Sequence, residues 1–276
     1  NLAAAYDKFL ANATAPTGKD KTLTVAMSPD FAPMEFVDTA KSGDSKYVGF
    51  DVLLANYIAK ELDMTLEIKP MSFDACLIAC QTGKVDLAIS GFSWTAERAE
   101  NFLISDYYVA GENETEQVII TSKAKENTFK TTADFAGLKV GGQGGSLQEL
   151  LVKEQIVPAG GEYVPYEDLN VALAALIQGK IDALAVAKGN GDAYISKNKD
   201  TVAFSGFQFE IDEKYKNNVI LVNKNNTEML EKVNTVLAKA MAAGVYTSWY
   251  EACQIYSGIS TIDELGYDDE GNKITE

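Results

Sequence analysis

The sequence predicts an α/β fold made of two similar lobes, and two observations carry this prediction. Short apolar strands alternate with helices along the 276 residues, which is typical of parallel sheets covered by helices. Part of the pattern then recurs, because residues 81–88 (QTGKVDLA) are similar to residues 177–184 (IQGKIDAL). One copy alone would indicate only a helix-turn-strand connection. Two copies in equivalent contexts indicate two lobes.

The elements of the first lobe follow from helix caps and periodicity. A helix over residues 2–11 precedes a polar segment, and residues 1–21 together are expected to form an N-terminal linker or tether. Asp51 and Asp74 are the predicted N-caps of two helices, and Gly83 ends the second helix. We expect strands over residues 23–27, 66–69 and 85–89, and helices from residue 51 and over residues 75–82.

The second lobe is expected over residues 118–218, with a strand at 138–141 and a helix at 147–155. Two strand-like segments, residues 117–121 and 218–222, would act as hinge strands that carry the chain out to this lobe and back. The first lobe would then consist of residues 22–117 and 219–276, and would receive two helices at 228–243 and 247–256. A ligand cleft between the lobes is the expected place for a small molecule. The acidic tail, residues 263–276, is predicted to be solvated.

Composition excludes several classes of function. The formal net charge of -16 disfavours binding to nucleic acid or to an anionic membrane surface. The chain has no histidine, which excludes Ser-His-Asp, Cys-His and zinc-histidine chemistry. The three cysteines (Cys76, Cys80 and Cys253) are predicted to be buried thiols, with a bridge to Cys253 as the alternative. No apolar run reaches the ~20 residues of a membrane helix, and no signal peptide opens the sequence.

Arg98 is the only arginine in the chain. A guanidinium offers a planar fork that matches a carboxylate or a phosphate, which a lysine cannot reproduce. Arg98 ends the segment ISGFSWTAER (residues 89–98), in which a strand ends, small residues expose backbone N–H groups and Thr95 is the expected N-cap of a short helix. We therefore expect Arg98 to bind a ligand carboxylate. A surface salt bridge with Glu97 or Glu100 is the alternative.

A second anion-binding turn is expected where GGQGGS (residues 141–146) joins a strand to the start of a helix. The dinucleotide fingerprint would need a glycine at Leu147 and the P-loop would need Gly-Lys-Ser/Thr, so both nucleotide motifs fail. A tight turn without a ligand is the alternative. The preferred interpretation is a short anionic group held between this turn and Arg98.

Other residues divide into candidate ligand walls and structural groups. Phe31, Phe73 and Phe92 lie at loops or strand ends, where an aromatic ring can face a ligand, although each could equally belong to the core. Asp86 and Asp182 start the strands of the repeated segment, and we expect both to be structural.

With these residues identified, the sequence resembles the extracytoplasmic solute-binding proteins of amino-acid ABC transporters, which are bilobal proteins of the type II periplasmic-binding-protein family. The resemblance covers residues 23–256. It is carried by LTVAMSPDFAPMEF at 23–36, GFD at 49–51, FD at 73–74, GKVD at 83–86, SWTAER at 93–98, residues 102–108 and the closing helices. The family implies two Rossmann-like lobes, two hinge strands, closure around a ligand and delivery to a membrane permease.

The resemblance also implies roles for individual residues. Arg98 would bind the ligand α-carboxylate, assisted by Ser93 and by the backbone and hydroxyl of Ser146. The usual Gly-Thr-Thr turn of the second lobe reads Gly145, Ser146, Leu147 here. The further contacts that the resemblance implies are backbone groups of Ser90 and Gly91, a side-chain wall of Phe31, Phe73 and Phe92, and a polar contact from Gln143.

One departure from the family concerns the ligand amine. Ala187, followed by Lys188, stands where the family commonly has an aspartate that binds the α-amino group. Without that carboxylate, an ammonium in the cleft would be poorly compensated. Three ligand classes therefore stay open: an aromatic or aliphatic acid without an amine, a dicarboxylate that uses Lys188, or an amino acid whose amine reaches Asp192 or Asp30.

The predicted function is the substrate-binding component of an ABC importer that captures an amino acid or related small carboxylate. We expect a monomer that is not an enzyme, needs no metal or cofactor, and works with a membrane permease. Its expected location is the periplasm or the cell surface, with a signal peptide and a lipid anchor preceding the first residue. Two alternatives stay open: a dehydratase-like enzyme on the same scaffold, with Asp30, Glu35 or Asp192 as its acid, and a ligand-sensing receptor domain.

Overall fold

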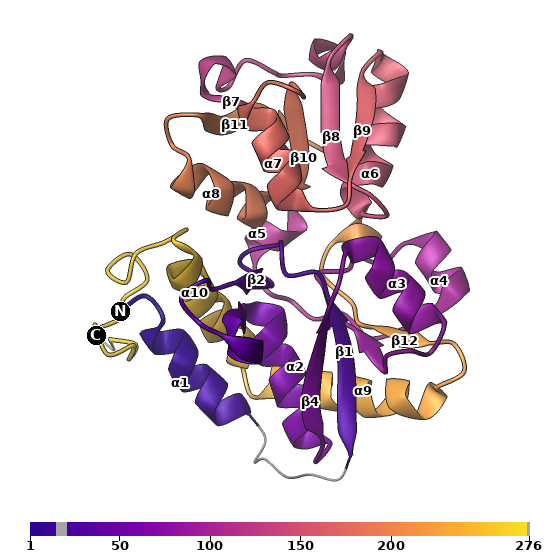
Figure 1. The fold of residues 1–276 in the computed structure, drawn as a ribbon, viewed down its shortest axis with the longest axis vertical. Coiled ribbons are helices and arrows are strands. Elements are labelled where there is room, and N and C mark those ends of the chain that lie inside the picture. The colour runs from indigo at the N-terminus through magenta and orange to yellow at the C-terminus, as the bar shows by residue number, and fades with distance from the viewer. Residues whose placement is uncertain (15–20, 275–276) are drawn as a thin grey trace. The chain divides into compact units, whose positions relative to one another are not determined.

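The computed structural model describes residues 1–14 and 21–274, and the chain divides into two compact units (Figure 1). Unit 1 contains Asn1–Met71, Ala75–Gly111 and Asn217–Glu276, and unit 2 contains Ser72–Asp74 and Glu112–Lys216. The long crossings between the units therefore fall at residues 111–112 and 216–217, whereas the sequence placed them at 117–118 and 218–219.

Unit 1 is built on a five-stranded sheet in the order β4-β1-β5-β12-β6. The strands β1 and β4 pair in parallel, β5 pairs in parallel with β1, and β12 runs antiparallel to both β5 and β6. Their bounds are β1 (Thr22–Met27), β4 (Thr65–Pro70), β5 (Leu87–Ala88), β6 (Phe102–Ile104) and β12 (Leu221–Asn223). A separate hairpin joins β2 (Phe36–Val37) to β3 (Tyr47–Val48).

The main core of unit 1 lies between this sheet and a group of packed helices. Apolar residues of α2, such as Leu53, Leu54 and Ile58, are fully buried there with strand residues such as Val25. The helices that contribute to this core are α1 (Ala4–Ala13), α2 (Phe50–Glu61), α9 (Thr227–Ala242) and α10 (Val245–Ser257). Two further helices, α3 (Phe73–Gln81) and α4 (Ala96–Asn101), follow β4 and β5 along the chain. Their buried residues, such as Cys80, lie outside the main core.

Unit 2 repeats the same sheet arrangement in the order β11-β7-β10-β8-β9. Here β8 pairs in parallel with β9 and β10, and β7 runs antiparallel to β10 and β11. The strand bounds are β7 (Gln117–Ser122), β8 (Lys139–Gln143), β9 (Glu162–Tyr166), β10 (Ala183–Ala187) and β11 (Val202–Gln208). The helices are α5 (Glu112–Thr115), α6 (Leu147–Leu151), which continues as a π-helical turn over Val152–Ile156, α7 (Leu169–Ile177) and α8 (Lys188–Lys197).

The two sheets correspond strand for strand, which confirms the predicted α/β class with two similar lobes. In each unit three parallel strands are followed by one antiparallel strand, β12 in unit 1 and β7 in unit 2. The segment 117–121, which is an expected hinge, lies within β7, and the second expected hinge, 218–222, overlaps β12 at residues 221–222. Counted from β4 in unit 1 and from β9 in unit 2, each of these strands is the fourth of its sheet, and the crossings lie outside both strands.

The repeated segment has the same structural role in both units, as predicted for its aspartates. Asp86 Oδ2 accepts hydrogen bonds from the backbone N and the Oγ1 of Thr24, at 2.8 and 2.9 Å. Asp182 Oδ2 accepts one from the backbone N of Lys139, at 2.8 Å. The glycines that precede them, Gly83 and Gly179, have φ values of 72° and 71°, which explains why each helix ends there in a residue without a Cβ. Each aspartate thus ties its strand to the neighbouring parallel strand.

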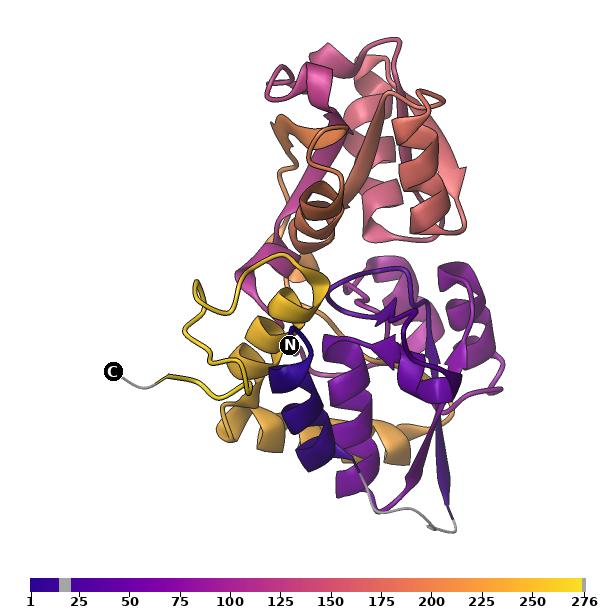
Figure 2. The same cartoon turned by 60° about the vertical axis from the view of Figure 1, so that its left-hand side comes forward.

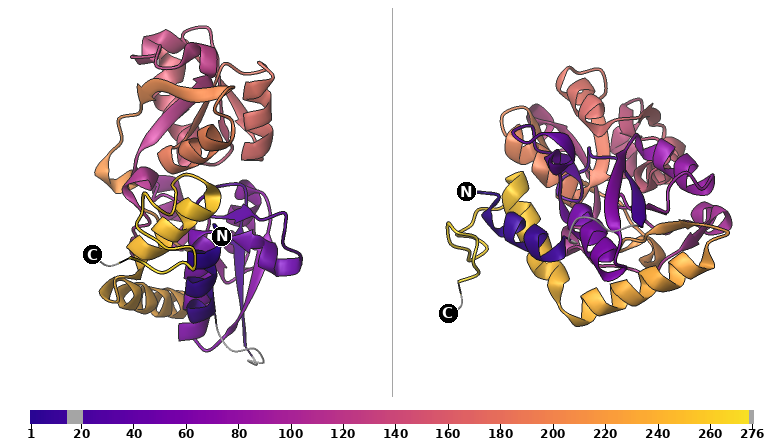
Figure 3. Two further views of the ribbon diagram at one scale, coloured as in Figure 1. Left: turned by 90° about the vertical axis from the view of Figure 1, so that its left-hand side faces the viewer. Right: turned by 60° about the horizontal axis from the view of Figure 1, so that its bottom comes forward.

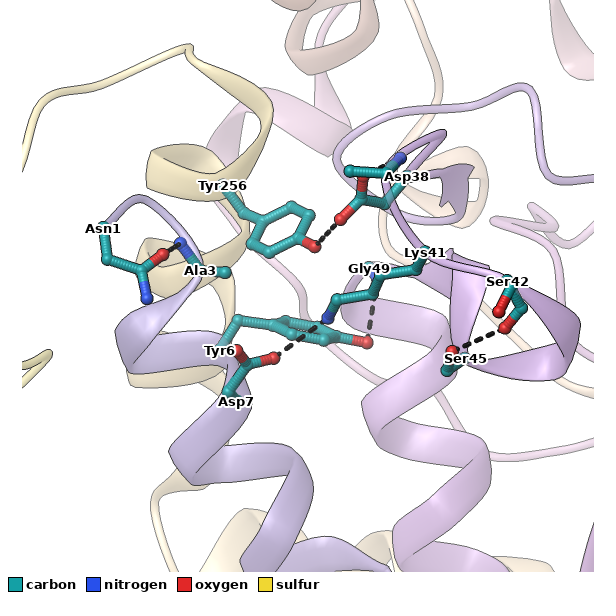
Figure 4. A network of polar contacts seen from close by, with 11 residues as sticks. Asn1, Ala3, Tyr6, Asp7, Asp38, Lys41, Ser42, Ser45, Gly49 and Tyr256 are labelled. Atoms are coloured by element: carbon teal, nitrogen blue, oxygen red, sulfur yellow. Dashed lines mark hydrogen bonds and ion pairs between the residues drawn. The ribbon is translucent and has the colours of Figure 1, made fainter.

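The N-terminal segment is part of unit 1, which corrects the expected linker over residues 1–21. Tyr6 of α1 is fully buried, and its hydroxyl accepts a hydrogen bond from Gly49 N at 3.2 Å (Figure 4). Lys41 pairs with Asp7 at 3.1 Å, and Tyr256 of α10 donates to Asp38. These contacts fasten α1, the β2–β3 hairpin and α10 together. Residues 15–20, the rest of the expected linker, lie outside the described residues.

The described part of the acidic tail, residues 263–274, packs on unit 1 rather than being merely solvated (Figure 2). Tyr267 is 2% exposed and belongs to the main core, and its hydroxyl donates to Glu251 Oε2 at 2.8 Å. Gly271 lies so close to α1 that a Cβ there would be 2.3 Å from Ala5 N. Figure 3 shows the C-terminal segment beside α1 and α10. Aromatic and glycine contacts hold this segment despite its charge.

Three local predictions have clear outcomes. Gly49, not Asp51, is the N-cap of α2, so the Asp51 side chain is available for other contacts. The helix α3 begins at Phe73, so Asp74 lies in its first turn instead of preceding it. The three cysteines are buried and free, as expected.

Candidate functional site

Arg98 lies on a short loop and helix that follow β5 in unit 1. Thr95 is the N-cap of α4, as predicted, and its side chain accepts a hydrogen bond from Arg98 N at 3.2 Å. The Arg98 side chain folds back on this loop, where Nη1 donates to the Ser93 carbonyl at 2.6 Å. Its guanidinium carbon lies 5.0 Å from the centre of the Phe92 ring. The loop therefore holds its own cation by a hydrogen bond and a cation–π contact.

Arg98 stays protonated although its side chain is buried. Only 5% of the residue is exposed, and burial lowers its pKa from 12.5 to about 10, partly offset by the nearby Glu97. The side chain thus stays protonated at neutral pH, although burial makes the cation unfavourable. A buried, preorganised guanidinium is a suitable partner for a planar anion such as a carboxylate. Because Arg98 is buried, its position argues against the alternative, an exposed salt bridge with Glu97 or Glu100.

A hydrogen-bond network lies beneath the same loop. Asp51 accepts from Gly91 N at 2.6 Å and from the Tyr108 hydroxyl at 2.8 Å. Ser90 Oγ donates to Glu35 Oε1 at 2.5 Å and accepts from Ser28 N at 2.9 Å. The amide of Gly91 and the hydroxyl of Ser90 are therefore directed inward. A ligand contact through the Gly91 amide, one of the backbone contacts expected here, disagrees with this arrangement.

The aromatic residues expected to form a ligand wall differ in position. Phe31 is half-buried and covers the turn, because a Cβ on Gly91 would lie 2.6 Å from its Cε1. Phe92 is fully buried and its ring lies against the Arg98 guanidinium, so it supports that side chain. Phe73 is 7% exposed at the start of α3. Trp94, which is not among the predicted site residues, is half-buried on the same loop.

In unit 2, the glycine-rich turn already contains an anion of its own. Glu149 Oε2 accepts a hydrogen bond from Gly145 N at 2.5 Å, and Glu149 also forms an ion pair with Lys153. Ser146 caps α6 by accepting from Glu149 N at 3.2 Å, while its hydroxyl donates to the Gln143 carbonyl at 2.6 Å. The Gly145 amide and the Ser146 hydroxyl are thus engaged within the turn itself, and the role of this turn as a second anion site stays a prediction.

The remaining predicted contacts of unit 2 are partly structural. Gln143 is 4% exposed and its amide donates to the Glu167 carbonyl at 3.2 Å, and Leu147 belongs to the apolar core of the unit. Ala187 ends β10 and precedes α8 with 2% exposure. Lys188 pairs with Asp192 at 2.6 Å, and both line a cavity of about 170 Å³ with apolar residues such as Val118, Ile120 and Phe204. Lys188 is thus balanced by a neighbouring carboxylate.

The structure brings one set of predicted residues together within unit 1: Arg98, Ser93, Phe92, Gly91, Ser90 and Phe31. Asp51 and Tyr108, which hold this set from beneath together with Glu35, were missed as site residues, and Glu35 was named only as an acid of the enzyme alternative. The only sequence signal for them is their place in the APMEF, GFD and DYY segments, which says nothing of burial. A ligand contact that spans both units stays a prediction.

Among the described residues, no three His, Cys, Asp or Glu side chains are grouped so as to hold a metal ion. Across residues 1–14 and 21–274, no helix has both the length and the apolar character to cross a bilayer.

Comparison with known proteins gives consistent matches. The model of the bacterial extracellular solute-binding proteins, family 3, matches residues 23–252. The structure of an amino acid ABC transporter substrate-binding protein from Streptococcus pneumoniae, bound to L-arginine, has 30% identity and a TM-score of 0.77, covering 87% of this chain and 97% of that one. An ancestral arginine-binding protein has 33% identity and a TM-score of 0.74, covering 85% and 98%. A probable histidine-binding protein from Campylobacter jejuni is 29% identical, covering 79% of this chain and 83% of the relative.

A bilobal binding protein has two corresponding α/β units, and here the first unit presents a preorganised arginine after one of its strands. The chain belongs to the bacterial extracellular solute-binding proteins, family 3. The predicted resemblance to the solute-binding proteins of amino-acid ABC transporters is therefore confirmed.

Proposed function

We propose that this protein is the substrate-binding component of an ABC importer and captures an amino acid or a related small carboxylate by closure of its two lobes. The observation that carries the proposal is the buried cation of Arg98, held by Ser93 and Phe92 on a loop that follows a parallel strand. Relatives named for histidine, cystine and arginine support an amino-acid ligand.

The α-amine of the ligand is the point on which this chain differs from the family pattern. Ala187 offers no carboxylate, and Asp192 is already paired with Lys188 at 2.6 Å. Asp30 is 6% exposed and accepts from Ser28 Oγ at 2.9 Å. An amine would therefore have to share a carboxylate that has a partner, whereas an acid without an amine needs no such group. We propose both ligand types as candidates, and a comparison of their binding distinguishes them.

The candidate acids of an enzyme are committed to internal contacts, which favours binding over catalysis. Glu35 is fully buried against Ser90, and Asp192 forms an ion pair. In the proposed role the protein is a monomer outside the cytoplasm, anchored by a lipid, which hands its ligand to a membrane permease. The family description as extracellular supports the location.

Thermal unfolding against a panel of L-amino acids and their amine-free analogues tests the proposal. A ligand present at 100 times its Kd stabilises the native state by about 2.7 kcal/mol, which raises the Tm by roughly 5–10 °C for a domain of this size. A shift with amino acids supports an amino-acid receptor, and a shift with only the amine-free acids supports a carboxylate receptor. If no compound shifts the Tm, the proposed function is wrong.

A further inference from the structure

Two carboxyl groups are buried side by side in unit 1, beneath the loop that leads to Arg98. Glu35 and Asp51 are both fully buried, close to the main apolar core. Within the described part of the chain, neither forms an ion pair with a lysine or with Arg98. Two adjacent carboxylates without a counterion would be very unfavourable in such a place. One of the two groups is therefore expected to carry a proton.

The direction of each hydrogen bond indicates which group that is. Ser28 N donates to Ser90 Oγ at 2.9 Å, so the single proton of Ser90 is directed to Glu35 Oε1 at 2.5 Å. Asp51 receives a donor on each oxygen, Tyr108 on Oδ1 and Gly91 on Oδ2, which suits an ionised carboxylate. Glu35 Oε2 is buried and accepts no hydrogen bond from any donor group. If Oε2 carries a proton that points at Asp51, each hydrogen bond of this network has one donor and one acceptor.

The electrostatic environment also favours a proton on Glu35. Burial raises the pKa of Glu35 well above its usual value, and the charges of Asp51 and Asp30 raise it further. Burial raises the pKa of Asp51 to about 6, while hydrogen bonds from Tyr108, Glu35 and Gly91 oppose the rise. The other titratable groups that interact with the pair are Tyr108 and Cys253, and burial raises the pKa of each, so both stay neutral. The directions of both carboxyl pKa shifts favour a pair that keeps one proton at neutral pH.

We propose that Glu35 is a neutral carboxylic acid which, with the Asp51 carboxylate, positions the Ser90–Gly91 turn for ligand binding, an inference that rests on the proposed function. Gly91 has a φ of 58°, and its amide is held by Asp51 while the Phe31 ring covers its other side. Ser90 is held by Glu35. The shared proton thus keeps two successive residues of the loop in place, and the same loop continues to Ser93 and Arg98.

Infrared spectroscopy of the unliganded protein tests the proton directly. At pH 7 the wild type should show the C=O stretch of a buried, protonated carboxylic acid. This band should vanish in Glu35→Gln and persist in the matched control Glu231→Gln, which changes an exposed glutamate of the same unit. The amide of Glu35→Gln can accept from Ser90 and donate to Asp51, so this variant should fold normally. Absence of the band from the wild type, or failure of Glu35→Gln to fold, overturns the proposal.

Ligand binding tests the positioning role. The Kd of Glu35→Gln should match that of the wild type at pH 7 within about twofold, since the network is kept, whereas Glu35→Ala should bind about tenfold or more weakly. As the pH rises through the pKa of Glu35, the affinity of the wild type should fall while that of Glu35→Gln stays constant. Equal losses in Glu35→Gln and Glu35→Ala at pH 7 would show that the negative charge is required, which contradicts the inference. Because the infrared band is measured without ligand, it decides the inference even if the proposed function fails.

Discussion

Replacing Arg98 with methionine should weaken ligand binding strongly and leave the unliganded protein at least as stable as before. Methionine removes the cation but keeps an unbranched apolar chain above the Phe92 ring. Truncating one partner of a buried charged pair costs about 2–5 kcal/mol of binding free energy. That loss corresponds to an increase in Kd of roughly 30-fold to several thousand-fold.

The effect on stability has the opposite sign. The fall of the Arg98 pKa from 12.5 to about 10 means that burial of the cation costs the fold about 3 kcal/mol at neutral pH. The substitution removes this cost but also leaves the Ser93 carbonyl without its guanidinium donor, which costs about 1–2 kcal/mol. The net expectation is a gain of roughly 1–2 kcal/mol, or a Tm higher by about 2–8 °C.

Titration calorimetry with the ligand found in the panel, together with thermal unfolding without ligand, measures both quantities. Lys232→Met is the matched control, because it removes an exposed cation from α9 in the same unit and should change neither. An affinity of Arg98→Met within about threefold of the wild type would refute carboxylate binding by Arg98. A large fall in the unliganded Tm would instead show that Arg98 is mainly structural.

Four further outcomes are expected. Introducing a carboxylate by Ala187→Asp should raise the affinity for amino acids relative to their amine-free analogues, and calorimetry showing an equal effect on both would contradict this role for position 187. Asp86→Ala removes the acceptor of two hydrogen bonds from Thr24, so urea unfolding should show a loss of about 1–3 kcal/mol; an unchanged midpoint would refute the strand-tying role. Gly271→Ala has no room for its Cβ against α1 and should expose the tail to limited proteolysis, and wild-type resistance would argue against the packing described here. Because the pKa of Asp51 is raised to about 6, its contribution to stability is present below about pH 4 and is lost as the pH rises through 6. The Tm difference between the wild type and Asp51→Asn should therefore fall from pH 4 to pH 7, and a constant difference would contradict the raised pKa.

Much of the fold was predictable because its signals are local. The alternation of strands and helices, the Thr95 cap and the two glycines that end helices each depend on a few neighbouring residues. The repeated segment also indicated two similar sheets, and the strand orders of the two units correspond. The loop with Arg98 was identifiable for the same reason, since the strand end, the cap and the arginine lie within ten residues.

The sequence could not show which partner a residue of a local motif meets. The glycine-rich turn of unit 2 predicts an anion site, and in the structure Glu149 supplies a carboxylate to the Gly145 amide. Phe92 is a predicted wall of the ligand site, and in the structure its ring also lies against the Arg98 guanidinium. The acidic composition of the tail predicts a solvated segment, but Tyr267 lies in the core. In each case the partner, which lies outside the motif, adds a role that the residue type alone does not indicate.

The sequence by itself determined the family, the two α/β units and the loop that carries the single arginine, because caps, periodicity and short motifs act over a few residues. Only the tertiary structure decided what holds that loop. Ser90 meets Glu35 across 55 positions of the chain, and Gly91 meets Asp51 across 40. Whether a carboxyl group is ionised depends on the water that folding removes and on the donors that folding brings to it. No pattern of neighbouring residues contains that information.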